Sequence, residues 1–191
     1  MTQPSPAPGA VRRLAEALVA ASTGRRALIA LAVFVVFTAT VLPWQAGIAA
    51  EYGEGVGSPD TSLWYSADGL YELAEAYGDD GRAAYVRARV TFDVVWPLVY
   101  AAMLALALGW LLRRATAPLA RLRVVVLLPI AALLADYAEN ACTAIVMARW
   151  PSTTDLLATL APMFTAAKWT LLGAAFLAVP VLGLLAVRRS R

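Results

Sequence analysis

Histidine is absent from this 191-residue sequence, and Cys142 is its only cysteine. A disulfide within the chain, a CxxC redox pair, haem ligation through histidine and a zinc site built from cysteine and histidine are therefore excluded. Any metal ion would have to bind oxygen ligands, and we expect neither a metal nor another cofactor. Lysine is also scarce, because only one of the 16 lysine and arginine residues, Lys168, is a lysine.

Charged residues make up only 15% of the chain, whereas 61% of the residues are hydrophobic. This composition is typical neither of a soluble domain nor of a disordered chain, and it predicts an all-α, polytopic membrane protein. The many arginines and alanines suggest a GC-rich bacterial coding sequence, so we expect the bacterial cytoplasmic (inner) membrane. Membrane lipid is then an expected partner, and nucleic acid is not.

Four apolar runs are long enough to cross a bilayer, at about residues 27–44, 92–112, 124–147 and 160–187. We therefore expect one transmembrane domain, residues 27–187, folded as a four-helix bundle. For the first run, a cleavable signal peptide is the alternative, since small residues follow it. We favour a membrane span, because the run is longer than the usual core of a signal peptide.

The remaining segments are short and polar. Residues 1–26 form a tail and an amphipathic helix, and residues 188–191 form a second tail. The segment 45–91 contains a predicted amphipathic helix from Ser66 to Tyr77, which would lie on the membrane surface or across the mouth of the bundle. Eleven arginines fall in the two tails and the turn between spans two and three, while most acidic residues fall in 45–91. The positive-inside rule then predicts that both termini are cytoplasmic and that 45–91 is extracytoplasmic.

The third span carries the most informative polar pattern. Its polar residues Asp136, Glu139, Asn140 and Thr143 recur at i, i+3, i+4 and i+7, and therefore share one helix face. Each ionised group facing lipid would cost about 2.5 kcal/mol or more. We therefore expect this face to look toward other helices or a hydrated cavity.

The second and fourth spans supply matching polar groups. Pro97 cannot donate a hydrogen bond to the carbonyl of Asp93, which leaves a polar oxygen beside a carboxylate. Lys168 lies where its ammonium cannot easily reach either surface, and Glu139 is the favoured partner, with Asp136 and Asp93 as alternatives. The predicted ligand-binding pocket, which opens outward, is formed by Asp93, Trp96, Tyr100, Asp136, Glu139, Asn140, Thr165 and Lys168.

The run Asp136–Asn140, together with Asp93, Pro97, Tyr100 and Lys168, resembles a pattern found in small four-span bacterial membrane proteins that are uncharacterised. The resemblance covers about residues 71–168. It implies a shared four-helix fold and the same polar cluster, but no activity. Characterised four-span families fit poorly, because they need paired cysteines, histidines or a longer Asp-rich signature.

Three functions remain open at this point. The favoured one is a non-enzymatic protein, either a monomer or a homo-oligomer, that binds or transports a small amphipathic or cationic ligand. The second is a lipid-modifying enzyme in which Glu139 or Asp136 is the general base and Lys168 orients substrate. The third is an assembly protein in which the buried ion pair only fixes helix register.

Overall fold

The computed structural model describes residues 9–52, 57–59, 62–114 and 117–188. Within these ranges the chain is helical and contains no β-strand, so the prediction of an all-α protein is confirmed. In chain order the helices are α1 (Ala10–Ala21), α2 (Gly24–Tyr52), α3 (Ala67–Ala76), α4 (Gly78–Val90), α5 (Phe92–Arg114), the 3₁₀ helix η2 (Ala117–Leu127), α6 (Leu128–Arg149) and α7 (Asp155–Arg188).

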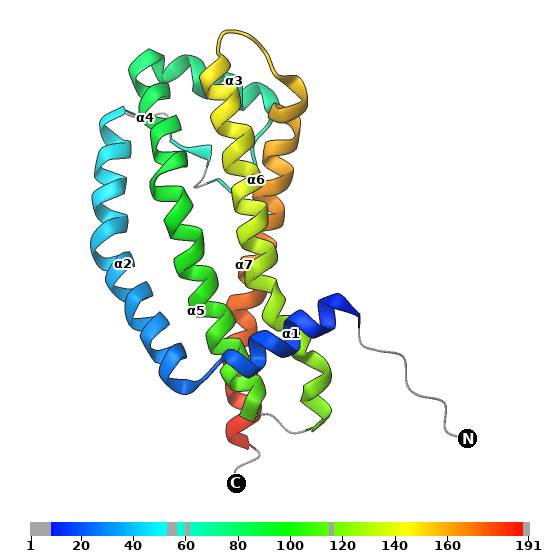
Figure 1. Ribbon diagram of the computed structural model, residues 1–191. Coiled ribbons are helices and arrows are strands. Elements are labelled where there is room, and N and C mark those ends of the chain that lie inside the picture. The colour runs from blue at the N-terminus through cyan, green and yellow to red at the C-terminus, as the bar shows by residue number, and fades with distance from the viewer. Residues whose placement is uncertain (1–8, 53–56, 60–61, 115–116, 189–191) are drawn as a thin grey trace.

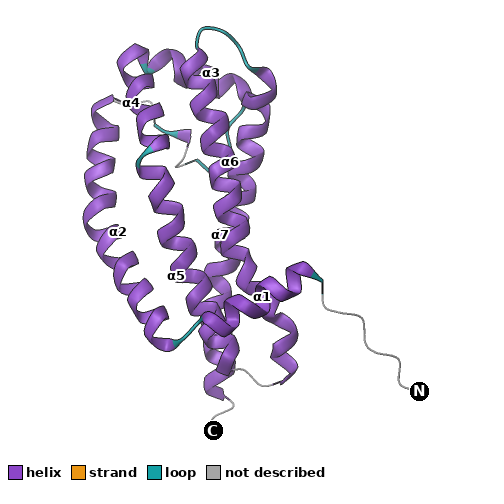
Figure 2. Cartoon of the chain, viewed as in Figure 1, coloured by secondary structure: helices purple, strands orange, loops and turns teal. Residues whose placement is uncertain are grey.

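The long helices run side by side along one axis, with α4 and α5 following each other end to end (Figure 1). The helix α1 crosses one end of this bundle, and α3 lies at the other (Figure 1). Figure 2 shows short loops between α1 and α2 and between α6 and α7, and a longer connection before α3, of which residues 57–59 and 62–66 are described. The most extensive contact is between α6 and α7, whereas α2 packs mainly against α5. The helix α2 is therefore the most weakly enclosed member of the bundle.

Three helical stretches are long and apolar enough to cross a membrane, namely Gly24–Glu51, Gly78–Arg114 and Asp155–Leu185. The first of these has no fully buried residues in its most apolar window, so its side chains there are exposed or half-buried. The helix α6 carries Asp136, Glu139 and Asn140 and is not one of the three. These features define the chain as a membrane protein with a polar helix inside an apolar bundle.

Two apolar clusters form the core, one at each end of the bundle. The first joins Ala15 and Val19 of α1 to α5, η2 and the last part of α7. The second joins Leu70 and Ala74 of α3 to the outer parts of α6 and α7. Between the two clusters along α6 and α7 lie five buried polar residues, namely Asp136, Glu139, Asn140, Thr165 and Lys168. The polar groups are thus sealed between two apolar layers.

Several helix boundaries differ from the predicted ones. The sequence predicts that the first span ends at about residue 44, closed by Pro43, but α2 continues through Pro43 to Tyr52. A proline interrupts only one backbone hydrogen bond, and in lipid the remaining groups still require helical partners. The helix α6, predicted as a span from about residue 124, begins at Leu128, and Pro129 occupies its first turn, where the missing N–H costs nothing. The helix α7, predicted as a span from about residue 160, begins at Asp155 and places Pro162 well inside the helix.

The segment between α2 and α5 follows the prediction at α3 but not at α4. Ser66 caps α3, since its hydroxyl accepts a hydrogen bond from the Gly69 N–H at 3.0 Å. The sequence also predicts Asp80 as the N-cap of the next helix, and this is wrong, because α4 begins at Gly78 and Asp80 lies in its first turn. Gly78 has a φ of 61°, a left-handed conformation that glycine adopts without a steric penalty. This residue allows α4 to follow α3 directly.

The end of α1 is fixed by hydrogen bonds to its last carbonyl groups. Arg113 of α5 donates to the carbonyl of Ala20 at 3.0 Å and to that of Ser22 at 3.3 Å. Arg26 donates to the carbonyl of Ala21 at 2.6 Å. Helix C-termini leave such carbonyls without helical partners, and cationic donors there are favourable. Two arginines therefore attach α1 to the end of the bundle.

Replacing Gly109 by alanine is expected to destabilise this attachment. A Cβ atom at Gly109 would lie 2.2 Å from the Ser22 hydroxyl oxygen, 2.7 Å from Ser22 Cβ and 3.4 Å from Val19 Cα. Such overpacking costs about 1–3 kcal/mol, which outweighs the gain of about 0.5–1 kcal/mol from removing a helical glycine. The melting temperature in detergent should therefore fall. Gly173→Ala is the matched control, because nothing lies within 4 Å of the added atom, and it should leave the melting temperature unchanged or slightly higher.

Candidate functional site

Lys168 of α7 forms an ion pair with α6 in the middle of the bundle. Its ammonium nitrogen lies 2.5 Å from Glu139 Oε2 and 3.6 Å from Asp136 Oδ1. The Lys168 side chain is 7% exposed and that of Glu139 is 0% exposed. Of the three partners considered from sequence, Glu139 is therefore the nearest and Asp136 is second.

The second carboxylate oxygen of Glu139 is also bound. The hydroxyl of Thr165, one turn before Lys168 on α7, donates to Glu139 Oε1 at 2.7 Å. The hydroxyl of Tyr65, in the loop before α3, lies 3.2 Å from the Thr165 oxygen. On α6, Thr143 donates to the backbone carbonyl of Glu139 at 3.1 Å. Both oxygens of this fully buried carboxylate thus have a donor, as a charge in such surroundings requires.

Asp136 lies one turn away from Glu139 and accepts hydrogen bonds from two other side chains. Tyr100 of α5 donates to its Oδ2 at 2.9 Å, and Asn140 donates to its Oδ1 at 3.2 Å. The neighbouring residue Tyr137 points differently and donates to the backbone carbonyl of Val94 at 2.7 Å. The Val94 carbonyl is one residue after that of Asp93, the carbonyl that Pro97 leaves without its helical donor. These bonds hold α5 against α6.

A second buried ion pair extends the cluster to α4. Arg89 Nε lies 2.9 Å from Asp93 Oδ2, with the two side chains 10% and 11% exposed. The same guanidinium donates to Asn140 Oδ1 at 3.2 Å and lies over the Tyr85 ring, 4.4 Å from its centre. Arg89 therefore connects the Asp93 carboxylate on α5 to the polar face of α6.

Sequence reasoning missed Arg89, which was counted among the arginines of an external connection. The available signal was its spacing of four residues from Asp93, which places the two side chains on one face of a continuous helix. With Arg89 included, three carboxylates face two cations in the cluster. The carboxylates therefore outnumber the cations by one, rather than by two as they would with Lys168 alone.

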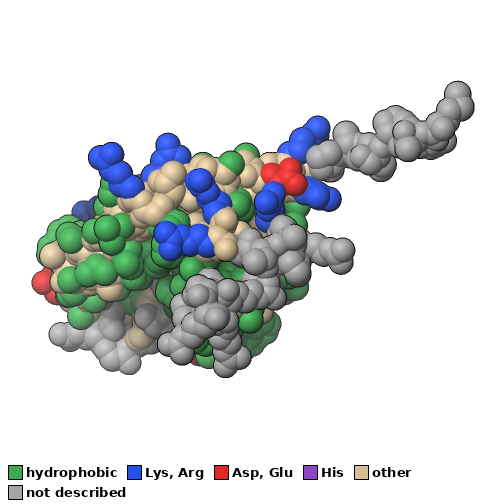
Figure 3. All heavy atoms as spheres, turned by 90° about the horizontal axis from the view of Figure 1, so that it is seen from below, with side chains coloured by type: hydrophobic (Ala, Val, Ile, Leu, Met, Phe, Trp, Pro, Cys, Tyr) green, Lys and Arg blue, Asp and Glu red, His purple; other side chains and the backbone are tan. Residues whose placement is uncertain are grey.

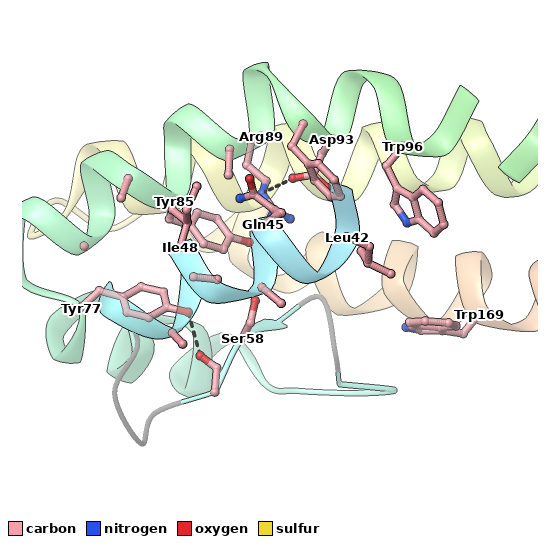
Figure 4. Close-up of a pocket in the computed structure, with 18 residues that line it drawn as sticks. Leu42, Gln45, Ile48, Ser58, Tyr77, Tyr85, Arg89, Asp93, Trp96 and Trp169 are labelled. Atoms are coloured by element: carbon pink, nitrogen blue, oxygen red, sulfur yellow. Dashed lines mark hydrogen bonds and ion pairs between the residues drawn. The ribbon is translucent and has the colours of Figure 1, made fainter. Parts of the chain in front are cut away.

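A cavity of about 690 Å³ lies between α2 on one side and α4 and α5 on the other, with Trp169 of α7 and the Gly57–Ser58 segment completing its wall (Figure 4). Its size is within the range of small-molecule binding sites, which is about 300–1,000 Å³. Most of the lining is apolar, and the ion pair of Arg89 and Asp93 lies against it (Figure 4).

The predicted pocket residues divide into two groups. Asp93 and Trp96 line the cavity, as does Trp169, which is not one of the predicted residues. The other six predicted residues form the buried network beside it, namely Tyr100, Asp136, Glu139, Asn140, Thr165 and Lys168. The cavity wall also contains groups that the sequence did not single out, among them Gln45 and Tyr85. Arg89 belongs to both parts, since it lines the cavity and contacts Asn140.

Aromatic stacking holds α2 at the inner end of the cavity. The Trp96 ring stacks on Phe34 at 5.6 Å and on Phe37 at 5.5 Å between ring centres. Trp96 also meets Tyr100 edge to face at 5.9 Å. Each such pair contributes about 0.5–1.5 kcal/mol beyond its buried area. This contact joins the first half of α2 to α5.

Among the described residues, no three histidine, cysteine, aspartate or glutamate side chains converge on a point that could hold a metal ion. The chain matches no protein-family model, no curated protein and no solved structure.

Proposed function

We propose that this protein binds a small amphipathic ligand in the cavity between α2 and the α4–α5 helix. The observation that carries the proposal is a cavity of about 690 Å³ with apolar walls and one buried ion pair, Arg89 with Asp93, at its side. Apolar walls with a few fixed polar groups are what small-molecule sites generally offer. Binding rather than catalysis is favoured because Glu139, the best candidate base, is fully buried and held by Lys168 and Thr165.

The proposal places the protein in the bacterial inner membrane with four spans: α2, α4–α5, α6 and α7. The three apolar stretches support three of these, and α6 would cross with its polar face covered by α5 and α7. Arginine side chains gather at the end where α1 lies, seen from below in Figure 3. The exposed ones include Arg12, Arg13, Arg25, Arg26, Arg113 and Arg114. The positive-inside rule makes this the cytoplasmic end, with the cavity near the opposite surface.

Thiol labelling of intact cells tests this orientation. In a Cys142→Ala background, Ser62→Cys and Ser152→Cys should react with an impermeant maleimide added outside, because both connections would be extracytoplasmic. Ser190→Cys should react only after the membrane is made permeable. External labelling at position 190 would invert the topology and place the cavity on the cytoplasmic side.

Filling the cavity should abolish ligand binding without unfolding the protein. Ala88 lines the cavity and is half-buried, so in Ala88→Phe the added ring would occupy ligand space. A saturating ligand at about 100 times its dissociation constant stabilises the folded state by about 2.7 kcal/mol, and the resulting rise in melting temperature should vanish in this variant.

Ala83→Phe is the matched control, because Ala83 lies on the same helix but is exposed and is not part of the cavity wall. It should keep the full rise in melting temperature. An amphiphile that stabilises the wild-type protein and Ala88→Phe equally would bind elsewhere, and the proposed function would then be wrong.

A further inference from the structure

The cavity has two chemically different ends. Figure 4 shows Tyr77 and Ser58 toward one end, Gln45 beside Arg89 and Asp93, and Leu42, Trp96 and Trp169 toward the other. The first end is polar, since the Tyr77 hydroxyl donates to the carbonyl of Gly57 at 2.7 Å. The second end is formed by an aliphatic side chain and two indole rings. A ligand that matches both ends has a polar head and a hydrocarbon chain.

The charges at the cavity wall come as an adjacent pair of opposite sign. Arg89 and Asp93 both line the cavity, 2.9 Å apart, and both are nine-tenths buried. A purely cationic head placed here would be attracted by the Asp93 carboxylate but repelled by the Arg89 guanidinium. A purely anionic head would be attracted by Arg89 and repelled by Asp93. A head that carries both charges can place its anion toward Arg89 and its cation toward Asp93.

From this arrangement we propose that the ligand is a zwitterionic amphiphile, a membrane lipid or lysolipid whose head binds beside Arg89 and Asp93 and whose chain extends past Trp96 and Trp169. This inference rests on the proposed function and names its ligand class. The chain can leave toward lipid on the side of α7, where the Trp169 side chain at the cavity wall is 37% exposed. The weak enclosure of α2 supports entry from the bilayer, because α2 packs mainly against α5.

Amphiphiles that share a dodecyl-length chain and differ only in head charge test the inference. The full-length protein in a nonionic detergent is melted with increasing amounts of dodecylphosphocholine, laurate or dodecyltrimethylammonium. The shift seen with Ala88→Phe is subtracted as the nonspecific part. The zwitterion should reach half of its maximal effect at an about tenfold lower concentration than either charged amphiphile, a difference of about 1.4 kcal/mol.

The double variant Arg89→Gln, Asp93→Asn removes both charges and keeps hydrogen-bonding groups. It should bind the three amphiphiles with equal half-saturating concentrations. The matched control is Arg12→Gln, Glu16→Gln, which removes the exposed ion pair of 3.0 Å at the other end of the bundle and should keep the wild-type preference. A preference for the cation in the wild-type protein, or a zwitterion preference that survives in the double variant, would overturn the inference while the proposed function stands.

A measurement on the wild-type fold covers the case in which the double variant does not fold. Phosphocholine with a brominated chain should quench tryptophan fluorescence, and the quenched fraction should fall in Trp169→Phe. Quenching that is unchanged in Trp169→Phe and Trp96→Phe would contradict the placement of the chain. If none of the amphiphiles shifts the melting temperature in a saturable way beyond the Ala88→Phe baseline, the proposed function itself is wrong.

Discussion

Replacing Lys168 by methionine is expected to lower the free energy of unfolding by about 3–5 kcal/mol, because it leaves the Glu139 carboxylate buried without its cation. The Glu139 side chain is 0% exposed and its Oε2 lies 2.5 Å from the ammonium nitrogen, so water cannot replace the lost partner. Thr165 would still donate to the other oxygen, but one neutral hydroxyl cannot balance the charge. Denaturation followed by circular dichroism in detergent measures the loss.

Glu139→Gln and Lys168→Met together form a double-mutant cycle. Glu139→Gln alone should lower the free energy of unfolding by less than Lys168→Met does. Asp136 lies 3.6 Å from the same ammonium and can remain its counterion. Adding Glu139→Gln to Lys168→Met should restore part of the stability, since position 139 then carries no charge, while Asp136 keeps its donors Tyr100 and Asn140. Adding Asp93→Asn should not restore it, because Asp93 is paired with Arg89 at 2.9 Å. Strictly additive losses in the double-mutant cycle would mean that Lys168 and Glu139 do not interact.

The double variant Lys168→Met, Glu139→Gln also tests whether the cluster supports binding or only fixes helix register. If the cluster supports binding, an amphiphile should raise the melting temperature of this double variant less than that of the wild-type protein. If it folds and keeps the full ligand-induced rise in melting temperature, the buried pair is better described as a register-fixing device, the assembly alternative among the functions considered from sequence.

Replacing Arg89 by glutamine should produce the second large effect, a loss of about 3 kcal/mol, for a related reason. The change leaves Asp93 buried at 11% side-chain exposure and removes the donor to Asn140 Oδ1. It also removes the cation above the Tyr85 ring. Stability should return in part when Asp93→Asn is added, because the remaining groups are neutral and can hydrogen-bond.

Arg12→Gln is the control for this variant. Arg12 pairs with Glu16 at the same i, i+4 spacing, but the two side chains are 72% and 34% exposed. An exposed pair of this kind contributes about 0–1 kcal/mol, so the melting temperature should barely change. Equal losses for Arg12→Gln and Arg89→Gln would show that burial does not set the strength of the Arg89 pair.

Periodicity was enough to predict the polar face of the third span. Asp136, Glu139, Asn140 and Thr143 are all buried, because a helix has a fixed angular repeat and lipid excludes charge wherever the helix lies. Helix ends were harder to predict. Pro43 was expected to end α2 and does not, since one lost hydrogen bond does not outweigh the cost of irregular backbone in an apolar setting.

The cavity could not be predicted from the sequence, because its walls come from segments far apart in the chain. Gln45 of α2, Arg89 of α4 and Trp169 of α7 meet there only through helix packing. Nothing in the local pattern around Gln45 distinguishes it from any other polar residue at the end of a span. The role of Arg89 was missed because charge counting assigns a residue to a connection, whereas only the packing of α4 against α6 brings Arg89 to Asn140.

The sequence by itself determined that this chain is a helical membrane protein and which residue types are buried at the centre of α6, because both follow from hydropathy and from the helical repeat. Only the tertiary structure decided how five charges are shared, with Lys168 between Glu139 and Asp136 and with Arg89 on Asp93. It alone also placed a cavity at Arg89 and Asp93 rather than among Lys168, Glu139 and Asp136. The physical reason is that ion pairing depends on distances of a few ångströms, which arise from how helices far apart in sequence pack together.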